Sequence, residues 1–288
     1  MAFESRWQST FKLQWNAFVA LGVDVFDIEH IDSSLRLHWR TPRNCRPRTL
    51  DRLRAGVPTL SEDHPSNRIL ASLSGGGQLP WSEHLQRVDL PAGHEVHVPG
   101  TATAHVYFPT TALVALMQPT PGRGDVSVAL VGNDGMLGVA AFMGDFFESG
   151  RAVVLHPGAA WTLPTSALTT HGPDSVQVTQ AVLGYLQALT DQMSQTALCQ
   201  RTHSVEQRLC RWLLMAFNRM PDDALAMDLG DLTVQLDVPI DVLSGAAARL
   251  VGLRVLAREP GRLRLLDRAA LQALACDCHA LAQSKRGM

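Results

Sequence analysis

The sequence predicts an α+β fold in three successive parts: an N-terminal antiparallel β-roll of the jelly-roll type, one long helix, and a C-terminal domain of helices closed by a β-hairpin. Three observations support this fold class. Short β-like runs separated by Gly and Pro fill residues 66–175, a helical period begins at Val178, and an arginine-rich hairpin lies near the C-terminus. Regular short strands with such turns are typical of jelly rolls. A switch from a period of two to a helical period marks the end of a sheet.

The composition is that of an ordinary globular protein and argues against several classes. The 288 residues are 46% hydrophobic and 18% charged, with a net charge of −2. No apolar run approaches the roughly 20 residues that a membrane span needs, and the start lacks a signal-peptide layout. The five cysteines are an odd number, and Cys276 and Cys278 are too close together for an ordinary bridge, which favours reduced thiols. We therefore expect a cytoplasmic protein with no membrane partner.

Residues 1–65 differ in character from the rest of the chain. A basic stretch broken by proline, residues 43–48, is followed by a polar linker at 61–65. We expect an N-terminal extension that is either disordered or the product of a wrongly assigned start. A small accessory element is the functional alternative.

The β-roll is expected over residues 66–175, where the predicted strands are 88–90, 95–98, 105–108, 112–116, 126–130, 152–155 and 160–163. Pro-Gly and Asn-Asp-Gly turns separate these runs. The segment carries four basic and eight acidic residues, a net charge of −4.

The long helix is expected over residues 176–200. Its apolar residues recur at three- and four-residue steps, close to the seam of a coiled coil: Val178, Val182, Tyr185, Leu189 and Met193. We interpret this seam as a dimer interface between two copies of the chain. The alternative is a single helix that covers the open face of the roll.

The C-terminal domain, residues 201–288, has the pattern of a winged helix-turn-helix. Ser204 and Gln207 form a capping box that starts a helix, and two short helices at 231–236 and 242–250 follow. A hairpin of residues 254–258 and 262–266 comes last. Helix, helix, helix, hairpin is the order of this domain type. Residues 249–268 carry six arginines against two acids, a basic stripe suited to phosphate contact.

Four motifs in this order resemble those of Crp/Fnr-type transcription regulators. Residues 106–109 and 128–138 look like the sensor roll of that family. Residues 203–213 and 275–278 resemble the junction and the tail of one uncharacterised branch. The resemblance covers about residues 66–280. It implies a homodimer that binds a near-palindromic DNA site under the control of a small-molecule effector in the roll, with RNA polymerase as a further candidate partner.

The effector segment departs from the family's cyclic-nucleotide cassette. That cassette pairs a Gly-Glu with an Arg-Ser-Ala, whereas this chain has Gly135-Met136, and Gly150 stands at the Arg position. Arg151 is displaced by one residue, which on a strand turns a side chain to the opposite face. We therefore expect an effector other than cAMP, and an Arg151 that pairs with a surface acid. The candidate effector residues are Gly135, Met136, Leu137, Gly138, Arg151 and Ala152.

The recognition helix also departs from the family pattern. Arginines that read guanine are expected at two positions that hold Ile240 and Gly245. Each missing bidentate pair costs about 1–3 kcal/mol of discrimination, so we expect weak, salt-dependent DNA binding through the hairpin. A sensor or partner-binding protein with little DNA binding is the alternative. The candidate DNA contacts are Ile240, Asp241, Ser244, Gly245, Arg249, Arg262 and Arg264.

The cysteines leave a metal or a redox switch open. The region ahead of the roll offers only Cys45, which argues against an iron–sulfur cluster there. Cys199, Cys210, Cys276 and Cys278 could converge on a metal or respond to oxidation. Cys210 is expected to be a buried structural thiol, and Cys-x-Cys is shorter than the usual metal knuckle. No metal site is therefore assigned, and the cofactor stays unknown.

A cupin-like enzyme is the alternative from another class. His94 and His97 are spaced so that an unbroken strand places them on opposite faces, and no nucleophile triad or nucleotide-binding glycine motif occurs. We assign no catalytic residues and expect no enzyme activity.

Overall fold

The computed structural model describes residues 67–73, 81–120, 122, 124–144, 150–171 and 176–279. All of them belong to one compact unit, residues 59–288. The predicted N-terminal extension, residues 1–65, lies outside the described residues. In the described part, no helix has the length and the apolar character needed to cross a membrane.

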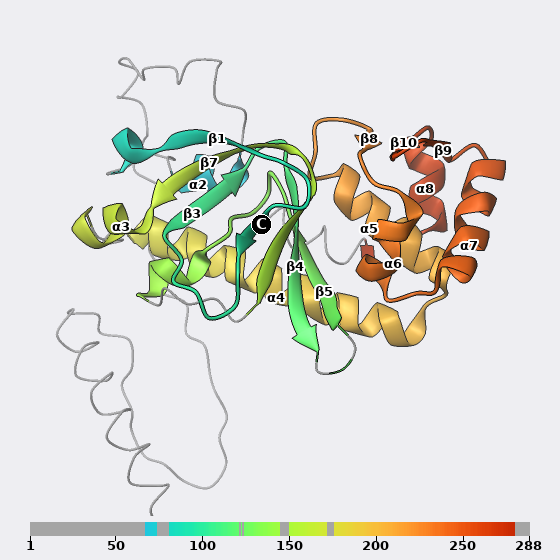
Figure 1. Cartoon of the computed structure of the whole chain (residues 1–288), viewed down its shortest axis with the longest axis horizontal. Helices are drawn as coiled ribbons and strands as arrows, with labels where there is room; N and C mark the ends of the chain where they lie inside the picture. The colour runs from blue at the N-terminus through green and yellow to red at the C-terminus, as the bar shows by residue number, and fades with distance from the viewer. Residues whose placement is uncertain are drawn as a thin grey trace, which may run out of the picture. The chain divides into compact units, whose positions relative to one another are not determined.

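The β-roll consists of two antiparallel sheets (Figure 1). The first has the strand order β1-β7-β3, made of β1 (Gln86–Leu90), β7 (Gly158–Pro164) and β3 (His105–Pro109). The second has the order β2-β6-β4-β5, made of β2 (Glu95–His97), β6 (Arg151–His156), β4 (Leu113–Thr120) and β5 (Gly124–Val131). Every predicted β-like run overlaps one of these strands. The predicted antiparallel roll is therefore confirmed.

Strand β4 is buried on both faces, which explains its continuous apolar sequence. Val114 points into the roll, where it meets Val154 of β6 and Ala160 of β7. Leu113 and Ala115 point the other way, into the core of the C-terminal domain. Short helices flank the sheets: α2 (Arg68–Leu73), η1 (Ser82–His84), η2 (Val139–Met143) and α3 (Thr165–His171).

Helix α4 (Val176–Thr202) is the predicted long helix, and it lies along the roll (Figure 1). Val178, Val182 and Tyr185 are at most 7% exposed and pack into the roll of their own chain, and Leu189 packs against the same cluster. Their burial leaves Val178, Val182 and Tyr185 little surface for a second copy, and the alternative of a helix that covers the roll describes these three residues. Half-buried Leu189 stays a predicted dimer contact. A seam of helical period identifies a buried face but not the partner that buries it.

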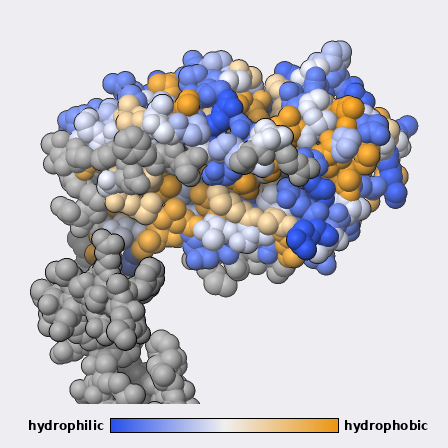
Figure 2. All heavy atoms as spheres, turned by 60° about the horizontal axis from the view of Figure 1, so that its bottom comes forward, coloured by the Kyte–Doolittle hydropathy of each residue, from blue (hydrophilic) through white to orange (hydrophobic). Residues whose placement is uncertain are grey.

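The opposite face of α4 is exposed. Leu183 is 58% exposed and Leu198 is 48% exposed. Figure 2, turned so that the side carrying α4 comes forward, shows a band of apolar side chains across the molecule. Half-buried Leu186 and Met193 lie between the two faces, so Met193 remains a candidate contact with a second copy.

The C-terminal domain has the predicted order of helices and hairpin. Its elements are α5 (Val205–Phe217), β8 (Ala224–Leu225), α6 (Leu229–Leu236), α7 (Ile240–Gly252), β9 (Leu256–Glu259), β10 (Arg262–Leu265) and α8 (Arg268–Leu274). The capping box is present: the Ser204 hydroxyl accepts from the Gln207 amide, and the Gln207 side chain accepts from the Ser204 amide. Asp237, at the tight turn between α6 and α7, has a positive φ of 49°. A winged helix-turn-helix is therefore confirmed as the fold of this domain.

Candidate functional site

Residues 132–138, the cassette loop, join β5 to η2 and hold most of the candidate effector residues. Met136 and Leu137 are 1% and 2% exposed. The Tyr185 hydroxyl of α4 donates to the backbone oxygen of Met136 at 2.7 Å, and the Asn67 amide donates to the oxygen of Gly135 at 2.8 Å. The loop is thus packed against α4 and against the segment that precedes the roll.

Glycine is required at two positions of the candidate effector region. A Cβ on Gly135 would lie 2.9 Å from Tyr185 Cε2 and 2.9 Å from Val131 Cγ1. A Cβ on Gly150, where the family's phosphate-binding Arg would stand, would lie 2.7 Å from the backbone oxygen of Met117. Contacts this short force the neighbours to shift. Gly138, the residue directly before η2, has a φ of 78°.

Arg151 is engaged by acids on neighbouring strands. Its guanidinium forms ion pairs with Glu95 of β2 and, at 2.5 Å, with Asp125 of β5. The expected pairing with surface acids is confirmed. Ala152 follows on β6 and is fully buried in the roll. The candidate effector residues therefore do not converge on one open cavity: Arg151 lies at the surface, whereas Met136, Leu137 and Ala152 are core.

A buried ion pair links the cassette loop to the C-terminal domain. Arg219, two residues after α5, is 2% exposed and places Nε 3.0 Å from Asp134 Oδ1. The same guanidinium donates to the Gln192 side chain of α4 and to the Met215 oxygen of α5, the latter at 2.9 Å. One side chain thus connects the roll, the long helix and the C-terminal domain.

The candidate DNA contacts lie on α7 and on the hairpin of β9 and β10, the wing. Ile240, Asp241, Gly245 and Arg249 are exposed, whereas Ser244 is half-buried. Arg249 Nε lies 3.3 Å from Glu206 Oε1, at the start of α5. A phosphate contact by Arg249 would have to replace that acid.

The wing alternates as predicted between buried and exposed side chains. Leu263 and Leu265 are 2% and 7% exposed, and Arg262 and Arg264 face solvent. Arg264 pairs with Glu259 across the hairpin at 3.0 Å, with both side chains more than 40% exposed. Exposed ion pairs of this kind contribute little to stability. Arg264 can therefore exchange Glu259 for a DNA phosphate at little cost, and Arg262 can reach a phosphate as well.

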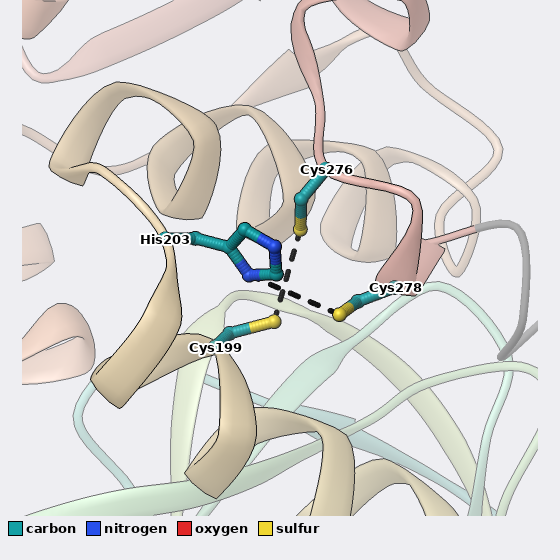
Figure 3. Close-up of side chains that lie close together, drawn as sticks. All are labelled: Cys199, His203, Cys276 and Cys278. Carbon is teal, nitrogen blue, oxygen red and sulfur yellow. Dashed lines mark hydrogen bonds between the residues drawn. The ribbon is translucent and has the colours of Figure 1, made fainter.

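A second constellation joins the end of α4 to the tail after α8. Cys199, His203, Cys276 and Cys278 place one ligand atom each within 4.8 Å of one another (Figure 3). The three cysteines are at most 4% exposed, and the imidazole is half-buried. Cys210 is fully buried in a different cluster, as expected of a structural thiol.

Burial dominates the electrostatics of these thiols. It raises the pKa of Cys199 to about 12, against the nearby charge of Arg211, which lowers it. It also raises the pKa of Cys276 and raises the pKa of Cys210 to about 12. Without a bound cation, these three buried thiols are therefore protonated at neutral pH, since a thiolate is costly to bury.

No protein-family model and no curated protein matches this sequence. Solved structures do match. FixK2 from Bradyrhizobium japonicum is 16% identical, covers 67% of this chain and 98% of its own, and has a TM-score of 0.56. A CRP-family transcriptional regulator from Thermus thermophilus is also 16% identical, covering 65% and 96%, with a TM-score of 0.54. The c-di-GMP-responsive regulator CLP from Xanthomonas campestris is 13% identical, covering 69% and 99%, with a TM-score of 0.52.

The chain has the Crp/Fnr fold. Sequence reasoning identified this fold and its wing, but it missed that His203 and Arg211 lie near the thiols. His203 directly precedes Ser204, the N-cap of α5. Its imidazole nevertheless lies beside the thiol of Cys278, which is 75 positions further along the chain. The sequence signal that was available is the four-residue spacing of Cys199 and His203, which places both on one face of a helix.

Proposed function

We propose that this chain is a DNA-binding transcription regulator that acts as a homodimer on a near-palindromic site. The observation that carries the proposal is the exposed surface formed by α7 and the wing, where Arg262 and Arg264 face solvent at the end of a winged helix-turn-helix. In such domains the second helix of the motif enters the major groove. Phosphate contacts from the flanking arginines supply affinity that does not depend on sequence.

The proposed mode of binding depends more on the wing than on base reading. Ile240 and Val242 on the first turn of α7 are 50% and 47% exposed and have no hydrogen-bonding group to offer a base edge. Asp241 would meet the negative DNA backbone unfavourably unless it accepted from a cytosine amino group. We therefore expect low sequence discrimination and a steep dependence on salt.

The homodimer is proposed to form through the exposed face of α4. Leu183, Thr190 and Ala197 recur at seven-residue steps on that face, and Leu186 and Met193 lie three positions after the first two. This is the spacing of a two-stranded a/d seam, and of its residues only half-buried Leu186 also packs against the roll. A parallel pair of α4 helices would present two winged domains to adjacent DNA half-sites.

The effector is proposed to be a small molecule other than a cyclic nucleotide. No carboxylate stands at Met136, Gly150 has no room for an arginine side chain, and Arg151 is held by two acids. The Arg219 connection through Asp134 and Gln192 supports the cassette loop as the place where an effector would influence the DNA-binding domain.

The proposal is tested by fluorescence anisotropy with the chain's own upstream DNA and a scrambled duplex of equal length, over a range of salt concentrations. A regulator should bind the upstream duplex more tightly at every salt concentration. Equal affinity for both duplexes would contradict recognition of a specific DNA sequence by this chain.

The second candidate function is a partner-binding sensor that does not bind DNA. The observation that favours it is the apolar character of exposed α7 and the turn after it, where Ile240, Val242, Val251 and Leu253 are 37–54% exposed. An absence of binding to either duplex at low salt would support this function instead.

A further inference from the structure

The cluster of Cys199, His203, Cys276 and Cys278 takes no part in the proposed DNA binding. Cys199 lies in the last turn of α4, and His203 directly follows the helix. The His203 amide donates to the Cys199 oxygen at 3.1 Å, so the two side chains lie one helical turn apart on one face. The other two come from the tail, where the His279 amide donates to the Cys276 oxygen at 3.0 Å in a tight turn. Figure 3 shows the four side chains pointing toward a common centre.

Two of the six distances between ligand atoms in this cluster are close to those of a tetrahedral site for one ion, and all six are within 4.8 Å. Cys199 Sγ lies 3.7 Å from Cys276 Sγ, and Cys278 Sγ lies 3.9 Å from His203 Nδ1. Zinc–sulfur bonds of about 2.3 Å in tetrahedral geometry separate two sulfurs by about 3.8 Å, and a sulfur from a nitrogen by about 3.6 Å. A disulfide requires about 2.05 Å between sulfurs and uses only two of the four groups. An iron–sulfur cluster places several iron and sulfide ions between its ligands and needs more room.

A buried positive charge beside the cluster is an independent observation. Arg211 of α5 is 4% exposed, and its Nη1 donates to Thr196 Oγ1 at 3.4 Å. Among the described residues, Nε and Nη2 of Arg211 have no hydrogen-bond partner. Buried charges are costly unless an opposite charge compensates them. Three thiolates and one divalent cation would carry a net charge of −1, which would compensate the guanidinium.

We propose that Cys199, His203, Cys276 and Cys278 bind one zinc ion in a closed structural site. Three sulfurs and one imidazole nitrogen fill all four tetrahedral positions, which is a known structural ligand set and leaves no position for substrate. On binding, each thiol releases its proton to solvent and becomes a thiolate ligand, while the neutral imidazole donates a ring lone pair. No oxidant or reductant takes part.

The ion fastens the C-terminal tail to the junction between α4 and α5. Ser204 caps α5 directly after His203, so the site fixes the point where the DNA-binding domain begins after the long helix. Cys276 and Cys278 follow α8 within four residues. Metal binding therefore holds Cys276 and Cys278 at this junction and limits the rotation of the C-terminal domain against α4.

The test measures metal in the full-length chain purified under reducing conditions. Elemental analysis and native mass spectrometry should find about one zinc per chain. After removal by a chelator, titration with Co²⁺ should produce the intense visible absorption of a tetrahedral thiolate site and saturate at one equivalent. Zinc should then displace the cobalt.

Variants assign the ligands and include a matched control. Cys199→Ser and Cys278→Ser should each reduce bound zinc from about one ion per chain to near zero after mild chelation, whereas Cys210→Ala, which removes another buried thiol, should keep it. The cobalt titration uses the unmodified chain, so it remains decisive if a variant does not fold.

Three results would overturn the proposal: no cobalt or zinc uptake by the unmodified chain, full zinc retention in both serine variants, or equal zinc loss in Cys210→Ala. These readouts do not involve DNA, so a failure of the proposed regulator function would leave them unaffected.

Discussion

Gly135 lies where the cassette loop passes beneath α4, and the space that a side chain would need is taken by Tyr185 and Val131. The hydroxyl of Tyr185 also holds the next carbonyl of the loop. The packing of one tyrosine thus explains both the glycine and the burial of Met136. A residue that belongs to a ligand cassette by sequence serves here as a contact between sheet and helix.

Gly135→Ala should destabilise the fold. The added methyl group would lie 2.9 Å from two side chains, and such overpacking costs about 1–3 kcal/mol of unfolding free energy. Denaturant unfolding measures the change. The control is Gly245→Ala, where nothing lies within 4 Å. Alanine at this position, inside α7, should stabilise by up to about 1 kcal/mol. An equal change in unfolding free energy in the two variants would contradict the close contact of Gly135 with Tyr185 and Val131.

His97 should make stability depend on pH. Burial lowers its pKa to about 4 from 6.5, opposed by a backbone hydrogen bond with His105 that raises it. The unfolded chain therefore takes up a proton at this histidine first as pH falls. The stability that the neutral buried imidazole contributes is complete above pH 6.5 and is lost as pH falls from 6.5 to 4.

The measurement is the unfolding free energy between pH 7 and pH 4, in steps. The unfolding free energy should fall less between pH 7 and pH 4 in His97→Gln than in the unmodified chain. The difference over the whole range should be up to about 3 kcal/mol. The exposed His94→Gln variant should keep the slope. A slope that is unchanged in His97→Gln would show that other groups cause it.

At the scale of elements, α4 has one apolar face that packs against the roll and one that is exposed. Val182 and Tyr185 pack into the roll of the same chain, whereas Leu183 is 58% exposed between them. The most apolar face of a helix can be buried within its own chain, while a second, less apolar face is left to contact another copy. The long apolar seam of this helix is the one that its own chain buries.

Leu183→Asp should convert a dimer into monomers without unfolding the chain, because the side chain lies outside the core and a charge at a two-stranded seam repels its copy. Sedimentation velocity measures the outcome. Leu189→Asp is the contrasting variant: it places a charge against the roll and should lower the unfolding free energy. A dimer that persists in Leu183→Asp would place the interface elsewhere.

At the scale of the whole molecule, charge is distributed unevenly along the chain. Residues 66–175 have a net charge of −4, from four basic and eight acidic residues, whereas residues 200–288 have a net charge of +2, from twelve and ten. An acidic roll repels nucleic acid, so the C-terminal domain is the part that would approach DNA. Arg219, buried between roll, α4 and α5, connects the two charge regions.

Replacing both Arg262 and Arg264 by alanine should weaken binding to all duplexes and flatten its salt dependence. Each lost phosphate contact reduces the slope of log affinity against log salt by about 0.9, which gives a reduction of about 2 per chain. Fluorescence anisotropy over a salt series measures it. The double variant Arg68→Ala and Arg87→Ala, which removes two exposed arginines from the roll side, should leave the slope in place. An unchanged slope in the wing variant would rule out wing contacts.

The sequence by itself determined the order of the parts, because that order depends on local periodicity and turn chemistry. The alternating runs of the roll, the capping box at Ser204 and the alternation of Arg262, Leu263 and Arg264 are local signals, and the structure confirms all of them. The departure from the family's cyclic-nucleotide cassette could also be read locally, from Gly135-Met136 and Gly150.

Only the tertiary structure decided which surfaces meet. Helical period showed that Val178 and Val182 are buried, but not that the roll buries them. Cysteine spacing suggested a weak Cys-x-Cys motif, whereas the fold brings Cys276 to Cys199 across 77 positions and Cys278 to His203 across 75. Contacts between residues so distant in sequence depend on how helices and sheets pack. No local pattern of side chains records that packing.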